Sequence, residues 1–185
     1  MNEYSDDELL RCFHDTSKRN EAFSVMVARY RERLYWHIRK IVLVHEDADD
    51  VLQNTFLKAW KGLGTFKCEA KLYTWLYRIA TNESINFLNQ KRSRQMMPLE
   101  DAGYLLSHSL HHDAYFSGDE LQMQLQQAIL TLAEKQRIVF NMRYFDEMPY
   151  EDISEILGTS AGALKATYHH AVNKIKDWFE SIDIQ

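Results

Sequence analysis

Apolar residues recur at helical spacing along most of the chain. Between residues 20 and 42 they step by three or four positions, which predicts one long amphipathic helix. Its apolar stripe consists of Phe23, Val27, Tyr30, Leu34, Ile38 and Ile41. The same spacing predicts a short helix around residues 6–10 and another long helix over about residues 70–90. The apolar stripe of that long helix consists of Leu72, Leu76, Ile79, Ala80 and Phe87.

A further helix is expected between the two long ones. Asp47 is placed to cap its N-terminus, and Gly62 and Gly64 are placed to end it. Together the four helices predict a first compact domain.

The helical pattern breaks down over residues 93–118. This stretch is longer than the usual connection within a compact domain, so we interpret it as a linker. It contains His108, His111 and His112. A polar linker explains these histidines better than a metal site does, because no cysteine or second ligand pair accompanies them.

After residue 119 the pattern resumes and ends in a helix-turn-helix motif. A short helix at 151–157 is followed by Gly158-Thr159-Ser160 and by a long helix. Glycine supplies the left-handed backbone that a helix end before a tight turn needs, and Ser160 is placed to cap the long helix. Such a helix fits the major groove of DNA, with a plain helical hairpin as the alternative. Its outward positions are Lys165, Ala166, Thr167, His169, His170 and Asn173.

The predicted fold class is therefore all-α, with two small helical domains joined by a flexible linker. We expect the first domain at residues 1–92, the linker at 93–118 and the second domain at 119–185. The two cysteines have no metal-ligand spacing, the N-terminus is acidic, and no apolar run is long enough to span a membrane. These features predict a cytoplasmic protein.

Charge is segregated along the chain, although the formal net charge of −5 argues against nucleic acid. Acidic residues cluster between Glu46 and Asp50, which suits a basic protein partner. A basic segment that suits a phosphate backbone follows. Its cations are Lys71, Arg78, Lys91, Arg92 and Arg94. Solvated helix faces explain the charges alone equally well.

Aromatic residues interleave with the first of these cations. Tyr73, Trp75 and Tyr77 alternate with Lys71 and Arg78, and three asparagines follow. Aromatic rings stack on unpaired bases, amides read base edges and cations hold phosphates, so this segment predicts contact with opened DNA. A helical domain also needs large core residues, so half of the aromatics are expected in the core.

Four residues of the third helix predict a docking face. Asp50, Gln53, Asn54 and Leu57 follow an i, i+3, i+4, i+7 spacing, which places them on one side of a helix. A polar face with one apolar member suits docking on another helix, and a solvated face is the equal alternative.

Together these segments resemble the sigma factors of bacterial RNA polymerase, in particular the small extracytoplasmic-function (ECF) group. The first domain resembles the family's sigma-two domain in AFSVMVARYRERLY, DADDVLQNTFLKAWKGLGTF and LYTWLYRIATNESINFL. The second resembles sigma-four in LAEKQRIVFNMRYFDEMPYEDISEILGTSAGALKATYHHA. The segments follow the family's order over nearly the whole chain. The resemblance implies an alternative sigma factor that binds core RNA polymerase and promoter DNA, needs no cofactor and has an anti-sigma factor as a partner.

The resemblance also implies roles for residues of the first domain. Asp50, Gln53 and Asn54 match the surface that docks on the clamp helices of the largest polymerase subunit, and Leu57 shares their face. Phe66, Lys67 and Asn82 match positions that frame the flipped-out base of the minus-ten element, and Trp75 and Arg78 match positions near the melting duplex. From the basic segment we add Lys71, Lys91 and Arg92 as expected contacts on the minus-ten side.

For the second domain the resemblance implies recognition of the minus-thirty-five element. Residues matching or flanking the family's DNA contacts are Arg143, Ser160, Lys165, Ala166, Thr167, His169 and His170. The family's recognition helix is close to V-K-S-R-L-H-R-A-R, and here Thr167, His170 and Val172 replace three arginines. Each lost guanine contact removes about 1–3 kcal/mol of discrimination. We therefore expect the isolated second domain to bind DNA weakly.

Two other function classes compete with this interpretation. A stand-alone helix-turn-helix regulator would bind an operator without polymerase, usually as a dimer, but it gives no role to the basic fourth helix or the acidic third helix. A helical-bundle enzyme would need clustered ligands or acid–base pairs, and the sequence contains no such motif. We therefore expect no catalytic residues, no metal and no enzymatic activity.

Overall fold

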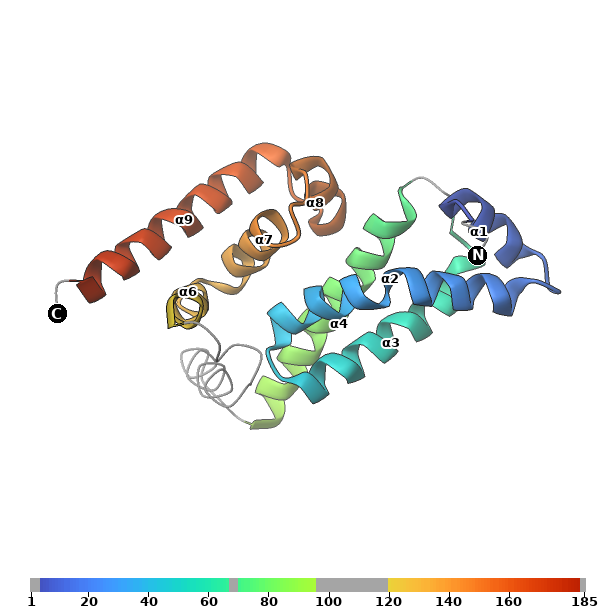
Figure 1. Cartoon of the computed structure of the whole chain (residues 1–185), viewed down its shortest axis with the longest axis horizontal. Coiled ribbons are helices and arrows are strands. Elements are labelled where there is room, and N and C mark those ends of the chain that lie inside the picture. The colour runs from blue at the N-terminus through green and yellow to red at the C-terminus, as the bar shows by residue number, and fades with distance from the viewer. Residues whose placement is uncertain (1–3, 67–69, 96–119, 184–185) are drawn as a thin grey trace.

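A computed structural model describes residues 4–66, 70–95 and 120–183. Within these ranges every regular element is an α-helix, as predicted (Figure 1). The helices are α1 (Asp6–His14), α2 (Arg19–Val42), α3 (His45–Leu63), α4 (Leu72–Gln95), α6 (Glu120–Leu130), α7 (Glu134–Tyr144), α8 (Tyr150–Leu157) and α9 (Ala161–Asp183).

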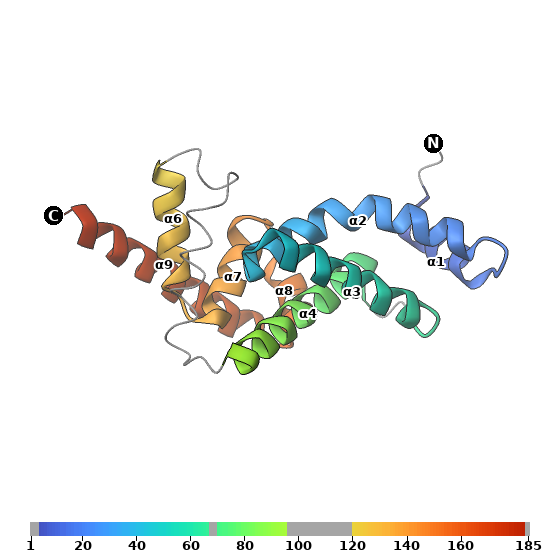
Figure 2. The ribbon, with the colours of Figure 1, turned by 90° about the horizontal axis from the view of Figure 1, so that it is seen from below.

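The first four helices form an N-terminal bundle. Helices α2, α3 and α4 pack against one another, and α1 lies on α2 (Figures 1 and 2). The predicted apolar stripes supply its core, since Leu34, Ile38 and Leu76 are fully buried. Burial of one such side chain contributes about 1.5–3 kcal/mol, so the stripes account for the way these helices face each other.

The starts of two helices differ from the sequence prediction. Ser5, the residue before the predicted start, caps α1 through a capping box with Glu8. The prediction that Asp47 caps the third helix is wrong. Leu43 takes a left-handed conformation (φ 66°) that ends α2, and α3 then begins at once with Val44 as its N-cap. Asp47 therefore lies inside the first turn of α3, where its charge favours the helix N-terminus.

Helices α6 to α9 form a C-terminal group in which α6, α7 and α8 all pack against α9. Two large apolar residues of this group are not core residues. Leu121 is 64% exposed, since only the last turn of α6 is buried, and Phe145 is 36% exposed because α7 has already ended there. The core of this group contains Ala128, Ile129, Leu132, Phe140, Ala171 and Ile175.

The two groups of helices are in direct contact. Helix α8 packs along α4 and α7 packs on α2, which both views of the ribbon show (Figures 1 and 2). Val139, Met142 and Ile153 of the C-terminal group belong to the same apolar cluster as the core of the N-terminal bundle. One continuous apolar core therefore crosses the junction.

Candidate functional site

The predicted docking face on α3 exists in the structure. Asp50, Gln53, Asn54 and Leu57 are all exposed, and Leu57 is 52% exposed. The opposite side of the helix is its buried stripe, formed by Ala48, Val51, Leu52, Thr55 and Ala59. The spacing thus predicted the shared face correctly, whereas its role in docking stays a prediction.

The aromatic residues at the start of α4 pack against the end of α3. Trp75 lies with its ring centroid 4.9 Å from that of Phe66. A Cβ atom at Gly62 would lie 3.0 Å from Trp75 Cζ2, so the glycine allows the indole to approach the helix. The structure therefore brings Phe66 and Trp75 together, both half-buried. The predicted contact Lys67 lies outside the described residues.

The predicted minus-ten cations on α4 have oxygen partners within the chain. Lys71 Nζ lies 3.1 Å from Asp152 Oδ1, and the Arg78 guanidinium donates to the backbone oxygen of Glu155. Both partners belong to α8. The other two cations also form ion pairs, Arg92 with Glu134 Oε2 on α7 at 2.6 Å and Lys91 with Asp47 Oδ2 on α3 at 2.6 Å.

Asn82 is exposed on α4, and Lys71 and Arg78 are exposed as well. The aromatic residues around it divide as the sequence suggested. Tyr77 is buried in the core, and Tyr73 and Trp75 are half-buried. Of the predicted contacts on α4, Asn82 is therefore an exposed amide, while the cations lie in ion pairs or hydrogen bonds.

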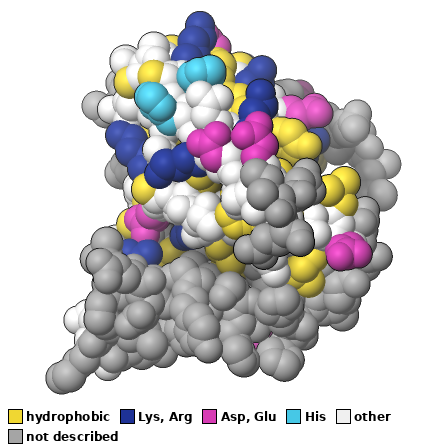
Figure 3. Space-filling model, turned by 90° about the vertical axis from the view of Figure 1, so that its left-hand side faces the viewer, with side chains coloured by type: hydrophobic (Ala, Val, Ile, Leu, Met, Phe, Trp, Pro, Cys, Tyr) yellow, Lys and Arg dark blue, Asp and Glu magenta, His cyan; other side chains and the backbone are white. Residues whose placement is uncertain are grey.

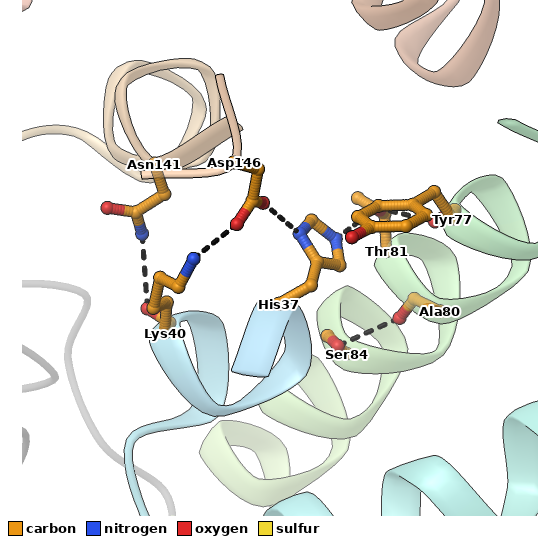
Figure 4. Close-up of polar contacts among 8 residues, drawn as sticks. All are labelled: His37, Lys40, Tyr77, Ala80, Thr81, Ser84, Asn141 and Asp146. Atoms are coloured by element: carbon orange, nitrogen blue, oxygen red, sulfur yellow. Dashed lines mark hydrogen bonds and ion pairs between the residues drawn. The ribbon is translucent and has the colours of Figure 1, made fainter. Parts of the chain in front are cut away.

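A polar network that the sequence did not predict joins α2 to the turn after α7 (Figure 4). His37 is 1% exposed, with Nδ1 3.2 Å from Asp146 Oδ2 and Nε2 2.8 Å from Thr81 Oγ1. The Thr81 hydroxyl donates to the backbone oxygen of Tyr77, so it accepts from His37 Nε2. The carboxylate of Asp146 can only accept, so His37 Nδ1 donates to it.

Asp146 is held as an ion by this network. Its burial opposes ionisation, but the hydrogen bond and charge of His37 and the ammonium of Lys40 outweigh burial, so the pKa of Asp146 lies below its ordinary value. Asn141 donates to the backbone oxygen of Lys40 at 3.3 Å, which adds a second contact between α7 and α2 (Figure 4).

The sequence did not predict this network because its central residue, His37, lies among the apolar positions of α2. His37 follows the buried stripe of α2, next to Ile38, so spacing alone places it in the core. Its partners lie 44 and 109 residues away along the chain. The one available signal is that a histidine in an apolar stripe needs a buried hydrogen-bond partner.

The helix-turn-helix turn has the predicted backbone. Gly158 has φ 62° and ends α8, and Ser160 Oγ accepts a hydrogen bond from Ala163 N at 3.4 Å at the start of α9. Both local predictions are confirmed. The turn is a left-handed glycine followed by a serine cap, as its sequence requires.

The predicted minus-thirty-five residues lie together on α9 and beside it. Lys165, Ala166, His169 and His170 are exposed, whereas Thr167 is half-buried and donates its hydroxyl to the backbone oxygen of Ala163 at 2.8 Å. Arg143 donates to the backbone oxygen of Met148 at 3.2 Å, and its guanidinium lies 5.2 Å from the ring centroid of Tyr150. Arg143 is therefore held beside the start of α8, the first helix of the helix-turn-helix motif.

Charge on the α9 side of the molecule is mixed. In the end-on view, Lys, Arg and His side chains lie among acidic side chains in the upper part of the face (Figure 3). Among the described residues of this face, charges of both signs are interspersed. Weak DNA binding by this group alone stays a prediction.

An open cleft lies where the two groups of helices meet. Its volume is about 520 Å³. It lies between α2, the start of α4 and the turn after α7, and its wall includes both aromatic and charged side chains. Among them are Arg33, Trp36, Lys40, Tyr73, Phe145 and Glu147.

Metal and membrane features were searched within the described ranges. No group of three or more His, Cys, Asp or Glu residues there is arranged to hold a metal ion. The three linker histidines lie outside these ranges. None of the described helices combines the length and the apolar character that crossing a membrane requires.

Family models match both groups of helices. The model described as Sigma-70 region 2 matches residues 26–94, and the model described as Sigma-70, region 4 matches residues 122–175. The first match covers α3 and α4 with both predicted surfaces, and the second covers the helix-turn-helix.

Curated relatives match most of the chain. The ECF RNA polymerase sigma factor SigW of Bacillus subtilis is 33% identical over 158 residues, covering 80% of this chain and 84% of the relative. The RNA polymerase sigma-H factor of Pseudomonas aeruginosa is 29% identical over 179 residues, covering 92% of each chain. The ECF RNA polymerase sigma-E factor of Escherichia coli is 28% identical, covering 82% of this chain and 83% of the relative.

Solved structures share the fold. CnrH, in a complex with the cytosolic domain of CnrY, matches with a TM-score of 0.69 and 22% identity, covering 95% of this chain and 97% of CnrH. The sigma factor RpoE, in a complex with the anti-sigma factor NepR from Bartonella quintana, matches with a TM-score of 0.63 and 22% identity, covering 85% of this chain and 96% of RpoE.

Proposed function

Since the chain belongs to the extracytoplasmic-function group of RNA polymerase sigma factors, we propose that it binds core RNA polymerase and directs it to a specific set of promoters. The observation that carries this proposal is the occurrence of regions 2 and 4 in one chain, in the family's order. A stand-alone regulator accounts for the second region and leaves the first without a role.

We assign residues 1–92 to a sigma-two domain, 93–118 to a linker and 119–185 to a sigma-four domain. The first bundle supports this division because it has its own buried stripes on α2, α3 and α4. The second is supported by the separate cluster that α6, α7 and α9 build.

Core polymerase is proposed to dock on α3 through Asp50, Gln53, Asn54 and Leu57. Exposure of all four residues supports this, since a docking face must be open to its partner. An exposed leucine surrounded by polar side chains offers apolar area to bury, and the acidic residue offers attraction for a basic helix.

The minus-ten element is proposed to contact α4 and the loop before it. Phe66 and Lys67 precede the helix, and Asn82 is exposed on it to read a base edge. Extruding a base costs a few kcal/mol, and the paired rings of Phe66 and Trp75 are proposed to offset part of that cost by contact with the base. The cations Lys71, Arg78, Lys91 and Arg92 are proposed to hold the phosphates of the opened strand.

The minus-thirty-five element is proposed to contact α9. Lys165, Ala166, His169 and His170 are exposed in the N-terminal half of this helix, which is the part of such a helix that meets base edges. Thr167 lies among these residues, and Ser160 precedes the helix. Arg143 is proposed to hold a phosphate beside the groove.

As a transcription initiation factor, the protein is proposed to catalyse no reaction itself and to work in the cytoplasm with the polymerase. An anti-sigma factor is proposed as a further partner. Both similar solved structures are complexes, one with the cytosolic domain of CnrY and the other with the anti-sigma factor NepR. The cleft between α2, α4 and the turn after α7 is the place we propose for such a partner.

Transcription in vitro tests the proposed function. Purified core polymerase is incubated with genomic DNA of the source organism, with and without the protein, and transcript 5′ ends are mapped. New start sites that share upstream elements are expected only when the protein is present. A set of start sites unchanged by the protein would overturn the proposal, provided that a known sigma factor activates the same core.

A further inference from the structure

One aromatic ring at the start of the helix-turn-helix motif contacts two cations that come from different helices. Tyr150 is the first residue of α8, and its side chain is half-buried. The guanidinium of Arg143 on α7 lies 5.2 Å from the centroid of this ring, and Lys165 Nζ on α9 lies 5.6 Å from it. Both distances fall within the range of about 6 Å over which an aromatic ring attracts a cation. Tyr150 therefore brings the two cations together.

Further contacts fix the ring and one of the cations in place. Tyr150 packs edge-on against Tyr168 of α9, with ring centroids 6.5 Å apart and ring planes at 76°. Arg143 donates from Nη1 to the backbone oxygen of Met148 at 3.2 Å. A guanidinium has five N–H donors, so this hydrogen bond leaves others for an anion.

The position of Lys165 around α9 differs from that of the other proposed DNA contacts on this helix. Leu164 is fully buried and marks the side of α9 that faces the core. Successive residues of an α-helix are rotated by about 100°, so Lys165 lies beside the buried side and Ala166 lies nearly opposite it. His169 and His170 are rotated to the same outward side as Ala166. Lys165 thus lies on the edge of α9 that meets α8.

The chemistry of the paired cations favours a phosphate as their shared partner. Two positive charges held on one ring repel each other, and an anion placed between them removes that repulsion. A phosphate is charged and has several acceptor oxygens, so it can accept from a guanidinium and an ammonium at once. A base edge in the major groove offers acceptors without a net charge. The place of Lys165 beside Arg143 therefore suits the DNA backbone better than a base.

We propose that Tyr150 is a positioning residue that holds Lys165 beside Arg143, so that both cations bind the phosphate backbone of the minus-thirty-five element. Reading of the bases then falls to the outward-facing residues of α9. This inference rests on the proposed function, which assigns α9 to that element. It moves Lys165 from the base contacts to the backbone contacts.

Backbone contacts and base contacts respond differently when they are removed. Loss of one phosphate contact weakens binding to all sequences alike, and it lowers the slope of log affinity against log salt concentration by about 0.9. Loss of one base contact relaxes the preference at a single position, roughly 5- to 150-fold. The salt slope and the base preference therefore distinguish the two roles of a lysine.

The test compares Lys165→Gln with Lys174→Gln in the full chain bound to core polymerase. Both lysines are exposed on α9 and both changes remove one positive charge, but Lys174 lies farther along the helix. The probe is a fluorescein-labelled duplex that carries the upstream element of one mapped start site. Fluorescence anisotropy at several salt concentrations gives the affinity and its slope. Unlabelled competitor duplexes, each with one base pair changed, give the preference at every position.

We expect Lys165→Gln to lower the salt slope by about 0.9 and to weaken all the duplexes by a similar factor. Its base preference should match that of wild type. Lys174→Gln is expected to match wild type in slope and in preference. An unchanged slope in Lys165→Gln, or a preference lost at one position, would overturn the proposal.

The role of the ring is tested by Tyr150→Leu, with Tyr150→Phe as the variant that keeps the ring. An aromatic ring attracts an exposed cation by about two- to fivefold. We expect Tyr150→Leu to bind the duplex about fivefold more weakly with a lower salt slope, and Tyr150→Phe to match wild type. A weaker affinity with an unchanged slope would mean that the ring only supports the fold, and the positioning role would fail. If circular dichroism shows that Tyr150→Leu is unfolded, Lys165→Gln decides.

The same titrations separate this inference from the proposed function. If core polymerase with the wild-type chain binds the duplex no better than core alone, the proposed function fails. If it binds the duplex but Lys165→Gln and Lys174→Gln have equal salt slopes, the backbone role of Lys165 fails and the proposed function stands.

Discussion

Two neighbouring helices of the N-terminal bundle carry the two proposed binding surfaces, and they differ in their contacts within the chain. On α3, Asp50, Gln53, Asn54 and Leu57 are all exposed. Lys71, just before α4, and Arg78 on α4 are exposed as well, but each also contacts an oxygen of α8. Residue types indicate what a surface binds, and the fold decides which contacts within the chain compete with that partner.

The largest effect is expected from mutating the exposed docking face on α3. Asp50→Lys combined with Gln53→Ala places a positive charge and a gap in the docking face, which costs several kcal/mol against a basic partner helix. We expect the affinity for core polymerase to fall about a thousandfold or more, which corresponds to about 4 kcal/mol. Titration of fluorescently labelled protein with core measures this.

The matched control is Glu32→Lys, which reverses an exposed charge on α2 outside the face. It is expected to bind core as the wild type does, and circular dichroism of both variants should match wild type. A loss of similar size in both variants would mean that net charge, and not the face on α3, governs docking.

The next effect concerns the polar network that holds the two groups of helices together. Asp146→Asn keeps the shape of the side chain but leaves His37 and Lys40 without a counter-ion. We expect the closed arrangement to lose about 2 kcal/mol, the usual contribution of a hydrogen bond to a charged group. A larger radius of gyration in small-angle scattering is the observable.

Glu147→Gln removes one charge from the adjacent, exposed position and serves as the control. It should leave the radius of gyration unchanged. An unchanged radius in Asp146→Asn as well would show that the apolar core across the junction suffices to keep the chain closed.

Much of the fold could be predicted because helices and their buried faces depend on local spacing. Leu34, Ile38 and Leu76 lie in predicted stripes and are fully buried. The four-residue face on α3 was found in the same way. Asp47 was misjudged as a cap, since the end of α2 at Leu43 depends on a left-handed backbone that no residue type there signals.

The contact between α8 and the start of α4 could not be predicted, because it joins residues far apart in the chain. Lys71 and Asp152 are 81 positions apart. Each of them has an ordinary local explanation, a solvated cation and an acid in the first turn of a helix. Their pairing depends on how two packed groups of helices meet, and spacing within one helix carries no information about that.

A smaller effect is expected from the turn that fixes α8 to α9. Gly158→Ala meets no atom within 4 Å of the new Cβ, so its cost comes from the left-handed backbone at φ 62°. We expect a loss of about 1 kcal/mol in the free energy of unfolding, measured by urea denaturation. Gly64→Ala is the control, because Gly64 has φ −62° and equally open surroundings. Equal losses in the two variants would contradict this assignment.

The smallest effect is a dependence of the closed arrangement on acid pH. The pKa of Asp146 is lowered in the closed chain from its ordinary value of 3.8, so the closed chain binds fewer protons there than the open chain does. Its stabilising contribution is therefore complete above pH 3.8 and is lost as pH falls below that value. The radius of gyration of wild type should rise on acidification, and part of that rise should be missing in Asp146→Asn. Identical acid profiles for the two proteins would show that Asp146 does not link the helices through its charge.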